Sequence, residues 1–287
     1  SSWPAFPSLA SAICGSFSEL PCQRSESWTE EEFRDAAVKM TDESKGQYGV
    51  MLGAGVIDWG RAIYGNGETQ IYDWNAKKMQ ATDNDALYHI WDLWINDLML
   101  NEKAAPAVLN SKDIGGGFET GKYGMALIGF WDIAEIHKVV QDSFEWDLIP
   151  LPTNETYGQW RTQMYANALS ISANSEKKDA AFEYIKWTLE NRDIQTNSVS
   201  LPVNKEISGD AEFLNEFADG AKHFNKQLAL DALANSVTWR NTGTVAEINN
   251  NVIKPEIERL ILKPDSTDLK TVLENIQTEG QKIFDAE

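Results

Sequence analysis

The pattern of apolar and polar positions becomes regular at Trp28. The run Thr29–Glu32 predicts a helix start, because the threonine hydroxyl can accept the amide hydrogen of Glu32 while the glutamate side chain reaches back to residue 29. Trp28 and Phe33 stand at the positions of a hydrophobic staple around this start. One apolar face follows at helical spacing, formed by Phe33, Ala36, Ala37 and Met40. We therefore expect a helix directly after Thr29.

Short apolar runs alternate with helical patterns along the rest of the chain. Strands are expected at 47–52, 123–129, 146–152 and 167–172. Helices are expected over 133–140, 178–191 and 266–284, and within 210–235 and 244–262. Another helix, capped by Asp83, has an apolar face formed by Leu87, Ile90, Trp91, Trp94 and Leu98. This alternation of strands and helices predicts an α/β architecture.

Residues 1–27 follow neither the strand period nor the helix period. They are rich in serine and contain both cysteines of the chain, Cys14 and Cys22. Two interpretations are open, an N-terminal arm or a segment with no folded role of its own, and we favour the second.

Length and charge exclude several classes of protein. At about 150 residues per domain, 287 residues predict two domains. A formal net charge of −19 argues against nucleic-acid binding, which needs a clustered basic face, and against docking on anionic lipid. No apolar run approaches the length of a membrane span, so we expect no transmembrane segment.

The sequence motifs give little support for catalysis. Gly116–Lys122 matches most of a phosphate loop, but Tyr123 replaces the hydroxyl residue that would hold magnesium, so we expect a glycine-rich turn. No pair of ligands at metal-binding spacing includes His89, His137 or His223, so we expect neither a metal nor a cofactor. A glycosidase carboxylate pair stays open as an alternative, because the chain contains 44 acidic residues.

Seven of the eleven tryptophans separate into two groups by their neighbours. Trp91, Trp94 and Trp187 lie at core positions of predicted helices. The second group lies near glycines or strand ends beside a planar polar side chain, and consists of Trp59, Trp131, Trp160 and Trp239. An aromatic ring covers the apolar face of a sugar while polar groups bind its hydroxyls, so the second group favours a carbohydrate ligand. For any single member, core packing is an equal alternative.

From residue 28 onward the chain resembles the extracellular solute-binding proteins, family 1, of sugar ABC transporters. The resemblance covers five stretches in the family's order: WTEEEFRDAAVKMT with GQYGVML; YDWNAKKMQATDNDALYHIWDLW; FETGKYGMALIGFW; WDLIPLPT; and NALSISANSEKKDAAFEYIKWTLENRDIQT with LPVNKE. The third stretch carries the family's F-x-x-G-K signature, with Gly124 where alanine is usual. Each stretch is weak alone, and the five together are specific.

The resemblance implies a type II periplasmic-binding-protein-like α/β fold of two lobes that close on a ligand by a hinge motion. Residues 28–164 and 205–287 would form the C-terminal-type lobe, and 165–204 would be a crossing segment of the N-terminal-type lobe. Much of that first lobe has no counterpart in the sequence, so we expect it to be incomplete. A fragment that does not bind is therefore a second alternative.

The resemblance also implies the site and the partners. Trp131 would be the main stacking platform, Trp59 a second ring, and Trp239 with Arg240 a third contact. The polar candidates are Asp58, Asp132, Gln163 and Tyr165. The expected partners are an oligosaccharide and the permease subunits of an ABC importer, and the protein would be a monomer without enzymatic activity. It would act in the periplasm or outside the cell, with a lipid anchor on a segment upstream of Ser1.

Overall fold

The computed structural model describes residues 10–15, 28–53, 55–61, 63–64, 70–110, 115–164, 168–196, 200–215, 226–238 and 243–286. For residues 10–15, 58, 215 and 238 it describes the backbone alone. Within these ranges, no helix is both long enough and apolar enough to cross a membrane.

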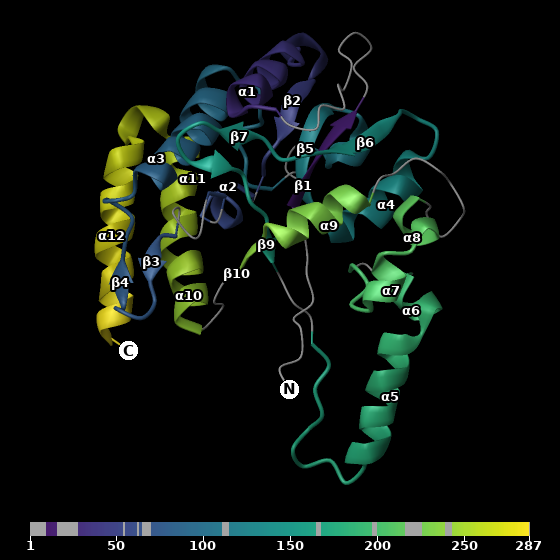
Figure 1. The fold of residues 1–287 in the computed structure, drawn as a ribbon. Coiled ribbons are helices and arrows are strands. Elements are labelled where there is room, and N and C mark those ends of the chain that lie inside the picture. Colours follow the sequence, from purple (N-terminus) through teal and green to yellow (C-terminus); the bar gives the residue numbers. More distant parts are fainter. Residues whose placement is uncertain are drawn as a thin grey trace.

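A four-stranded mixed sheet forms the centre of the molecule (Figure 1). Its strands are, in spatial order, β2 (Tyr48–Met51), β5 (Tyr123–Gly129), β1 (Ala10–Gly15) and β6 (Trp146–Ile149). β2 and β5 are parallel, whereas β1 is antiparallel to both β5 and β6. The expectation that residues 1–27 have no folded role is therefore wrong for Ala10–Gly15, because this strand supplies the backbone partners of two others.

Helices cover both faces of the sheet, and the side chains of β5 point alternately toward the two layers. All seven residues of β5 are buried, as in a central strand. Met125 and Leu127 point into one core cluster and Ala126 and Ile128 into another, because successive side chains of a strand face opposite sides. The first cluster contains residues of α1 (Glu30–Lys39), and the second contains residues of α4 (Phe130–Val140) and α9 (Gln227–Ala234).

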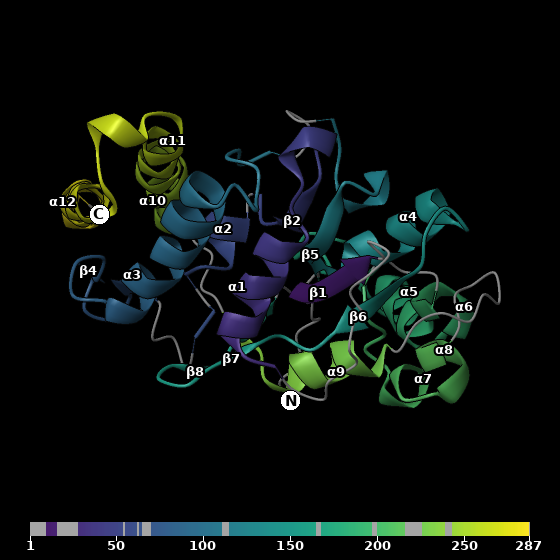
Figure 2. The same ribbon diagram turned by 90° about the horizontal axis from the view of Figure 1, so that it is seen from above.

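The first cluster continues into a helical layer, which lies on the left of Figure 1. In this layer α12 packs beside α11, and Figure 2 shows the two helices nearly end-on. The glutamines Gln277 and Gln281 on α12 accept the backbone amides of Ala81 and Met79. The layer consists of α2 (Gly55–Asp58), β3 (Tyr72–Asp73), β4 (Lys78–Met79), α3 (Asp85–Trp91), the π-helix η2 (Asp92–Asn101), α10 (Gly243–Ile248), the π-helix η5 (Asn249–Ile253), α11 (Lys254–Leu262), the 3-10 turn η6 (Pro264–Ser266) and α12 (Leu269–Ala286).

Most of the remaining elements lie below the sheet in Figure 1, whereas β7 lies beside α1. Strands β9 and β10 form a short parallel pair, and α5 projects away from the body of the molecule. These elements are β7 (Thr153–Asn154), β8 (Gly158–Gln159), β9 (Gln163–Met164), α5 (Lys178–Glu190), α6 (Arg192–Thr196), α7 (Lys205–Ser208), α8 (Ala211–Asn215) and β10 (Val237–Thr238), with the 3-10 turns η1 (Glu43–Lys45) and η4 (Phe118–Thr120).

Several local predictions are confirmed. The side chain of Thr29 accepts the amide of Glu32 at 3.1 Å, and the Glu32 carboxylate accepts the amide of Thr29 at 2.7 Å. The rings of Trp28 and Phe33 meet edge to face, as a staple requires. The glycine-rich stretch is a turn closed by Gly121 at a φ of 70°, and it leads directly into β5.

Other local predictions are wrong. The cap of α3 is Asn84, whose side chain accepts the amide of Leu87, and not Asp83. Residues 168–172 form no strand, and residue 167 lies outside the described part of the chain. Trp187, expected in the core, is 52% exposed, and α5 has no buried residue. Trp91 and Trp94 are fully buried as expected.

The packing of α1 on β2 depends on a close approach of two backbones at Gly49. A Cβ atom at this position would stand 1.7 Å from the carbonyl oxygen of Ala37. No side-chain movement can relieve such a clash, since the obstacle is backbone. The neighbouring Gly124 makes room for Met40, whose sulfur would lie 2.5 Å from an added Cβ, and this gives a reason for glycine where the family resemblance predicts alanine.

We expect Gly49→Ala to lower the free energy of unfolding by about 3 kcal/mol or more, because α1 must move away from the sheet. Chemical denaturation measures this change. The matched control is Gly243→Ala, where an added Cβ meets nothing within 4 Å, and its effect should stay within about 0.5 kcal/mol. Equal losses in the two variants would contradict the proposed packing.

Candidate functional site

Trp59 and Trp131 follow the carboxyl ends of two neighbouring parallel strands. β2 pairs with β5 so that Met51 lies opposite Ala126, which puts the carboxyl ends of both strands at one edge of the sheet. Trp59 comes directly after α2, and Trp131 is the second residue of α4. Ligands of open α/β sheets bind at this edge. The structure therefore places these two predicted residues where a binding site of this fold class is expected.

Each of these two indole rings lies over a glycine. A Cβ atom added to Gly129 would stand 2.2 Å from the ring of Trp131, and one added to Gly55 would stand 2.3 Å from the ring of Trp59. The rings differ in exposure: Trp131 is 37% exposed, whereas Trp59 is partly buried against the first core cluster. Trp131 is therefore the better stacking surface of the two.

Asp132 acts as a cap for α4. Its Oδ2 accepts the backbone amide of Gly129 at 3.2 Å. Burial raises the pKa of Asp132, the hydrogen bond from Gly129 opposes this rise, and the nearby charge of Glu119 adds to it. One carboxylate oxygen of Asp132 therefore caps α4, and only the other is available to bind a ligand.

Gln163 lies in the short parallel pair of β9 and β10, where it is opposite Val237 and almost fully buried. The carbonyl of Thr162 accepts the amide of Val237 at 2.9 Å in the same ladder. Gln163 thus belongs to the strand pair below the sheet and not to the sheet edge that carries Trp59 and Trp131. Of the remaining predicted contacts, Tyr165, Trp239 and Arg240 lie outside the described residues, and Asp58 is described by its backbone alone as the last residue of α2.

Trp160 is a core residue, so for this member of the second tryptophan group the core-packing alternative is confirmed. It is 1% exposed, and its ring meets those of Phe33 and Trp94 edge to face, with centroids 5.0 and 5.4 Å apart. The polar neighbour Arg161 gave a misleading signal, since adjacent residues of an extended segment point to opposite sides.

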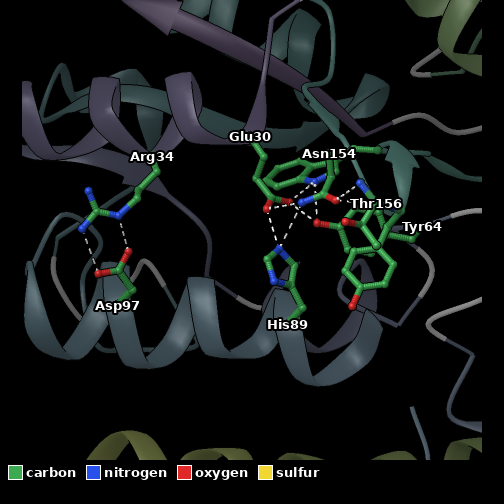
Figure 3. Close-up of polar contacts among 9 residues, drawn as sticks. Glu30, Arg34, Tyr64, His89, Asp97, Asn154 and Thr156 are labelled. Carbon is green, nitrogen blue, oxygen red and sulfur yellow. Dashed lines mark hydrogen bonds and ion pairs between the residues drawn. The ribbon is translucent and has the colours of Figure 1, made fainter. Parts of the chain in front are cut away.

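A buried polar cluster, which the sequence motifs did not predict, surrounds the carboxylate of Glu30 (Figure 3). Oε2 accepts the indole N–H of Trp160 at 2.8 Å and also the hydroxyl of Tyr64. Oε1 lies 2.5 Å from Nε2 of His89 and accepts the amide of Asn154 at 2.9 Å. We call these five residues the Glu30 cluster. Its members come from α1, α3, the hairpin of β7 and β8, and the segments around residues 64 and 160.

The electrostatics of the cluster favour an ion pair between Glu30 and His89. Burial alone would raise the pKa of Glu30, but the hydrogen bonds from His89, Tyr64 and Trp160 outweigh it and leave this pKa lowered. The hydrogen bond to Glu30 raises the pKa of His89, against a smaller opposing effect of burial. Burial and the charge of Glu30 also raise the pKa of Tyr64, so its hydroxyl stays a donor.

The sequence contained a signal for this cluster in its helical spacing. Glu30 lies on the same face of α1 as Phe33 and Ala37, both of which are fully buried. An acidic residue three and seven positions before core residues indicates a buried charge that needs partners. The run of three glutamates concealed this signal, because it is also typical of an exposed helix start.

A model of the family of bacterial extracellular solute-binding proteins matches residues 17–193, which is more than half of the chain. The chain belongs to this family. Family membership confirms that this solute-binding protein is a binding protein and not an enzyme, so the glycosidase alternative is wrong. It also confirms the extracellular part of the expected localisation.

Solved structures with the same fold cover nearly all of the solute-binding protein. An ABC substrate-binding protein of Listeria monocytogenes in complex with cycloalternan matches with a TM-score of 0.74 at 20% identity, over 97% of this chain and 70% of that chain. An ABC transporter solute-binding protein of Thermotoga lettingae bound with α-D-tagatose matches with a TM-score of 0.77 at 15% identity, over 98% and 71%. UgpB of Mycobacterium tuberculosis in complex with glycerophosphocholine matches with a TM-score of 0.71 at 21% identity, over 99% and 70%. Comparison with curated proteins gives no significant match.

These likenesses confirm the periplasmic-binding-protein-like α/β fold. The solute-binding protein spans about 70% of the length of the matched structures. The division into lobes and the crossing segment 165–204 stays a prediction. Among the residues that the structure describes, no group of three or more His, Cys, Asp or Glu side chains is placed to hold a metal ion.

We expect the stability of the solute-binding protein to depend on pH through His89. Because the folded pKa of His89 is raised, its ion pair with Glu30 contributes fully below the unfolded value of about 6.5, and the contribution is lost as pH rises through the folded pKa. At about pH 6 His89→Gln should cost about 1–2 kcal/mol, less than a fully buried pair, because the His89 side chain is 38% exposed.

Thermal or urea unfolding of both proteins between about pH 6 and pH 9 measures this effect. The difference in unfolding free energy between wild type and His89→Gln should shrink as pH rises. A difference that stays constant over this range would show that no proton is coupled to the pair.

Proposed function

We propose that this solute-binding protein binds a carbohydrate, in particular an oligosaccharide, outside the cytoplasmic membrane and delivers it to an ABC importer. The observation that carries the proposal is the exposed ring of Trp131 at the carboxyl end of the central strand β5, beside the end of β2 that leads to Trp59. A rigid indole at this edge suits the apolar face of a pyranose ring.

The matched structures support a sugar as the class of solute. Their ligands include cycloalternan, maltotriose, maltose and α-D-tagatose. The fold is thus used repeatedly for neutral, hydroxyl-rich solutes. A neutral ligand also suits a chain with a net charge of −19, which would repel an anion.

The further contacts of the proposed site are those that the family resemblance implies. Trp59 would provide a second ring, and Trp239 with Arg240 a third contact. The hydroxyl partners would be Asp58, Gln163 and Tyr165, together with the Asp132 oxygen that does not cap α4. The permease subunits as partners, the monomeric state and a lipid anchor remain parts of this proposal.

A second candidate solute is a zwitterionic phosphodiester. UgpB, one of the matched structures and 21% identical to this chain, is in complex with glycerophosphocholine. An exposed indole such as Trp131 can also bind a quaternary ammonium group by a cation–π interaction. The two candidates differ in what they need besides the ring, since a phosphate requires a cationic partner and a sugar does not.

Titration of the protein with maltose, maltotriose, tagatose and glycerophosphocholine, followed by tryptophan fluorescence and calorimetry, tests the proposal. We expect maltotriose to bind and to change the fluorescence. Trp131→Ala should weaken this binding by about tenfold or more, because the stacking surface and its buried area are lost.

The matched control is Trp187→Ala, which removes an exposed tryptophan of α5 that lies far from β5 in Figure 1. This variant should bind maltotriose as the wild type does. Binding of glycerophosphocholine alone would replace the sugar with the second candidate. Binding of none of the four solutes would favour the alternative of a chain that does not bind on its own.

A further inference from the structure

The Glu30 cluster lies toward the sheet edge that carries Trp59 and Trp131. α1 packs antiparallel to the strand that follows it, with Ala37 near its end against Gly49 near the start of β2. Its first residue, Glu30, therefore lies toward the carboxyl end of β2. Trp59 follows β2 at the same end. The cluster and the candidate ligand site thus lie toward the same edge of the sheet, the one at the carboxyl ends of β2 and β5.

Two donors of the cluster belong to segments that carry candidate ligand contacts. Tyr64 lies a few residues after Trp59, and Trp160 lies three residues before Gln163. Both side chains donate to the same oxygen, Oε2 of Glu30, and the indole N–H of Trp160 also lies 3.2 Å from the hydroxyl of Tyr64. One carboxylate oxygen therefore joins the segment after α2 to the segment that enters β9.

Backbone contacts continue this connection on both sides of the cluster. The amide of Arg161 donates to the carbonyl of Ile63 at 2.6 Å, so the two segments also meet directly. The guanidinium of Arg61, 2% exposed, donates to the carbonyl of Ile57 at 2.7 Å and to the side chain of Asn249. The segment from Trp59 to Tyr64 is thus held at two residues, at Arg61 by Ile57 and Asn249 and at Tyr64 by Glu30.

We propose that Glu30 is a positioning residue of the ligand site, whose carboxylate fixes the segment that carries Trp59 relative to the strand β9 that carries Gln163, with protonated His89 as its counter-charge. This inference rests on the proposed function for its effect on binding. Its structural part, the joint positioning of the two segments, does not.

The chemistry of the cluster makes the carboxylate hard to replace. Tyr64, Trp160 and Asn154 all donate hydrogen bonds to Glu30, so the central group has to accept on both oxygens. A glutamine keeps the shape but turns one acceptor into a donor, which leaves at least one buried donor without an acceptor. The groups that face the pair from the packed elements are Asp92 of η2, the phenols of Tyr64 and Tyr157, and the neutral amide of Asn154.

A second polar link, from α1 to η2, the π-helix that directly follows α3, supplies a matched control. Arg34, one turn along α1 from Glu30, donates to Asp97 of η2 at 2.6 and 3.1 Å (Figure 3). It also donates to Glu102 at 2.9 Å. This link is partly exposed and connects α1 to η2 without contacting the segments around residues 64 and 160 in the part of the chain that the structure describes. Arg34→Gln therefore weakens the packing of α1 on η2, next to α3 along the chain, without touching the proposed positioning role.

Hydrogen–deuterium exchange of Glu30→Gln and Arg34→Gln tests the structural part without any ligand. We expect Glu30→Gln to raise exchange about tenfold in the peptides that span residues 59–64 and 160–164 together, whereas Arg34→Gln leaves both near the wild-type level. Unchanged exchange in these peptides, or the same increase in both variants, would overturn the proposal.

Titration with maltotriose tests the effect on binding. Glu30→Gln should raise the Kd about tenfold, and Arg34→Gln should leave it unchanged. In the wild type the Kd should rise between about pH 6 and pH 9 as His89 loses its proton, and His89→Gln should abolish this pH dependence. A pH profile of the same shape in His89→Gln would overturn the role given to His89.

The outcomes separate this inference from the proposed function. If the wild type binds none of the solutes of the panel, the proposed function fails, and the exchange experiment still supports or overturns the positioning role. If the wild type binds maltotriose and Glu30→Gln binds it equally well, the positioning role fails and the proposed function stands. If Glu30→Gln does not fold, hydrogen–deuterium exchange of His89→Gln and of the wild type at about pH 6 and pH 9 replaces it. Faster exchange of residues 59–64 and 160–164 in His89→Gln, and in the wild type at the higher pH, would support the positioning role, and unchanged exchange would overturn it.

Discussion

A carboxylate inside a protein core has to be met by donors, and in this chain the donors of Glu30 come from segments that lie up to 130 positions away from it along the chain. The cost of leaving such a charge unpaired exceeds the gain from any single apolar contact nearby, so the cluster constrains where each segment can lie. α1, α3, the hairpin of β7 and β8 and the entry to β9 all meet at this one group. The first core cluster packs around it, and the rings of Phe33 and Trp94 both meet that of Trp160 edge to face.

Local chemistry made much of the fold predictable. The capping box at Thr29, the staple of Trp28 and Phe33 and the apolar run of β5 are each decided within a few residues, and all three occur as expected. β1 was missed because its role is non-local: the antiparallel partners of Ala10–Gly15 are more than a hundred positions away, and nothing in a short serine-rich segment indicates them. The same limit applies to Trp187, which stands at core spacing in its helix although no residue of that helix is buried.

The candidate site could be predicted in part, for a related reason. Trp59 and Trp131 follow glycines near strand ends, and the structure places both at the carboxyl edge of parallel strands. Trp160 has a similar sequence context but faces the core, because sequence neighbours do not reveal which side of an extended segment is covered. Glu30 and His89 gave no motif at all, since 59 positions separate them and only the packing of α1 on α3 brings their side chains together.

Trp131 and Glu30 belong to elements on opposite faces of the sheet. The surface that contacts a solute and the hydrogen bonds that position the site are therefore separate. α4, which carries Trp131, packs in the second core cluster, whereas the donors of Glu30 belong to the first. A substitution at the exposed ring of Trp131 therefore changes the surface offered to a solute without disturbing the buried charge. A substitution near Glu30 changes stability and the arrangement of the Trp59 segment at once, because the same hydrogen bonds serve both. Substitutions on α4 can thus change ligand preference at little cost in stability. The distance between the segment of Trp59 and β9 is fixed, because the buried carboxylate of Glu30 has to keep its hydrogen-bond donors.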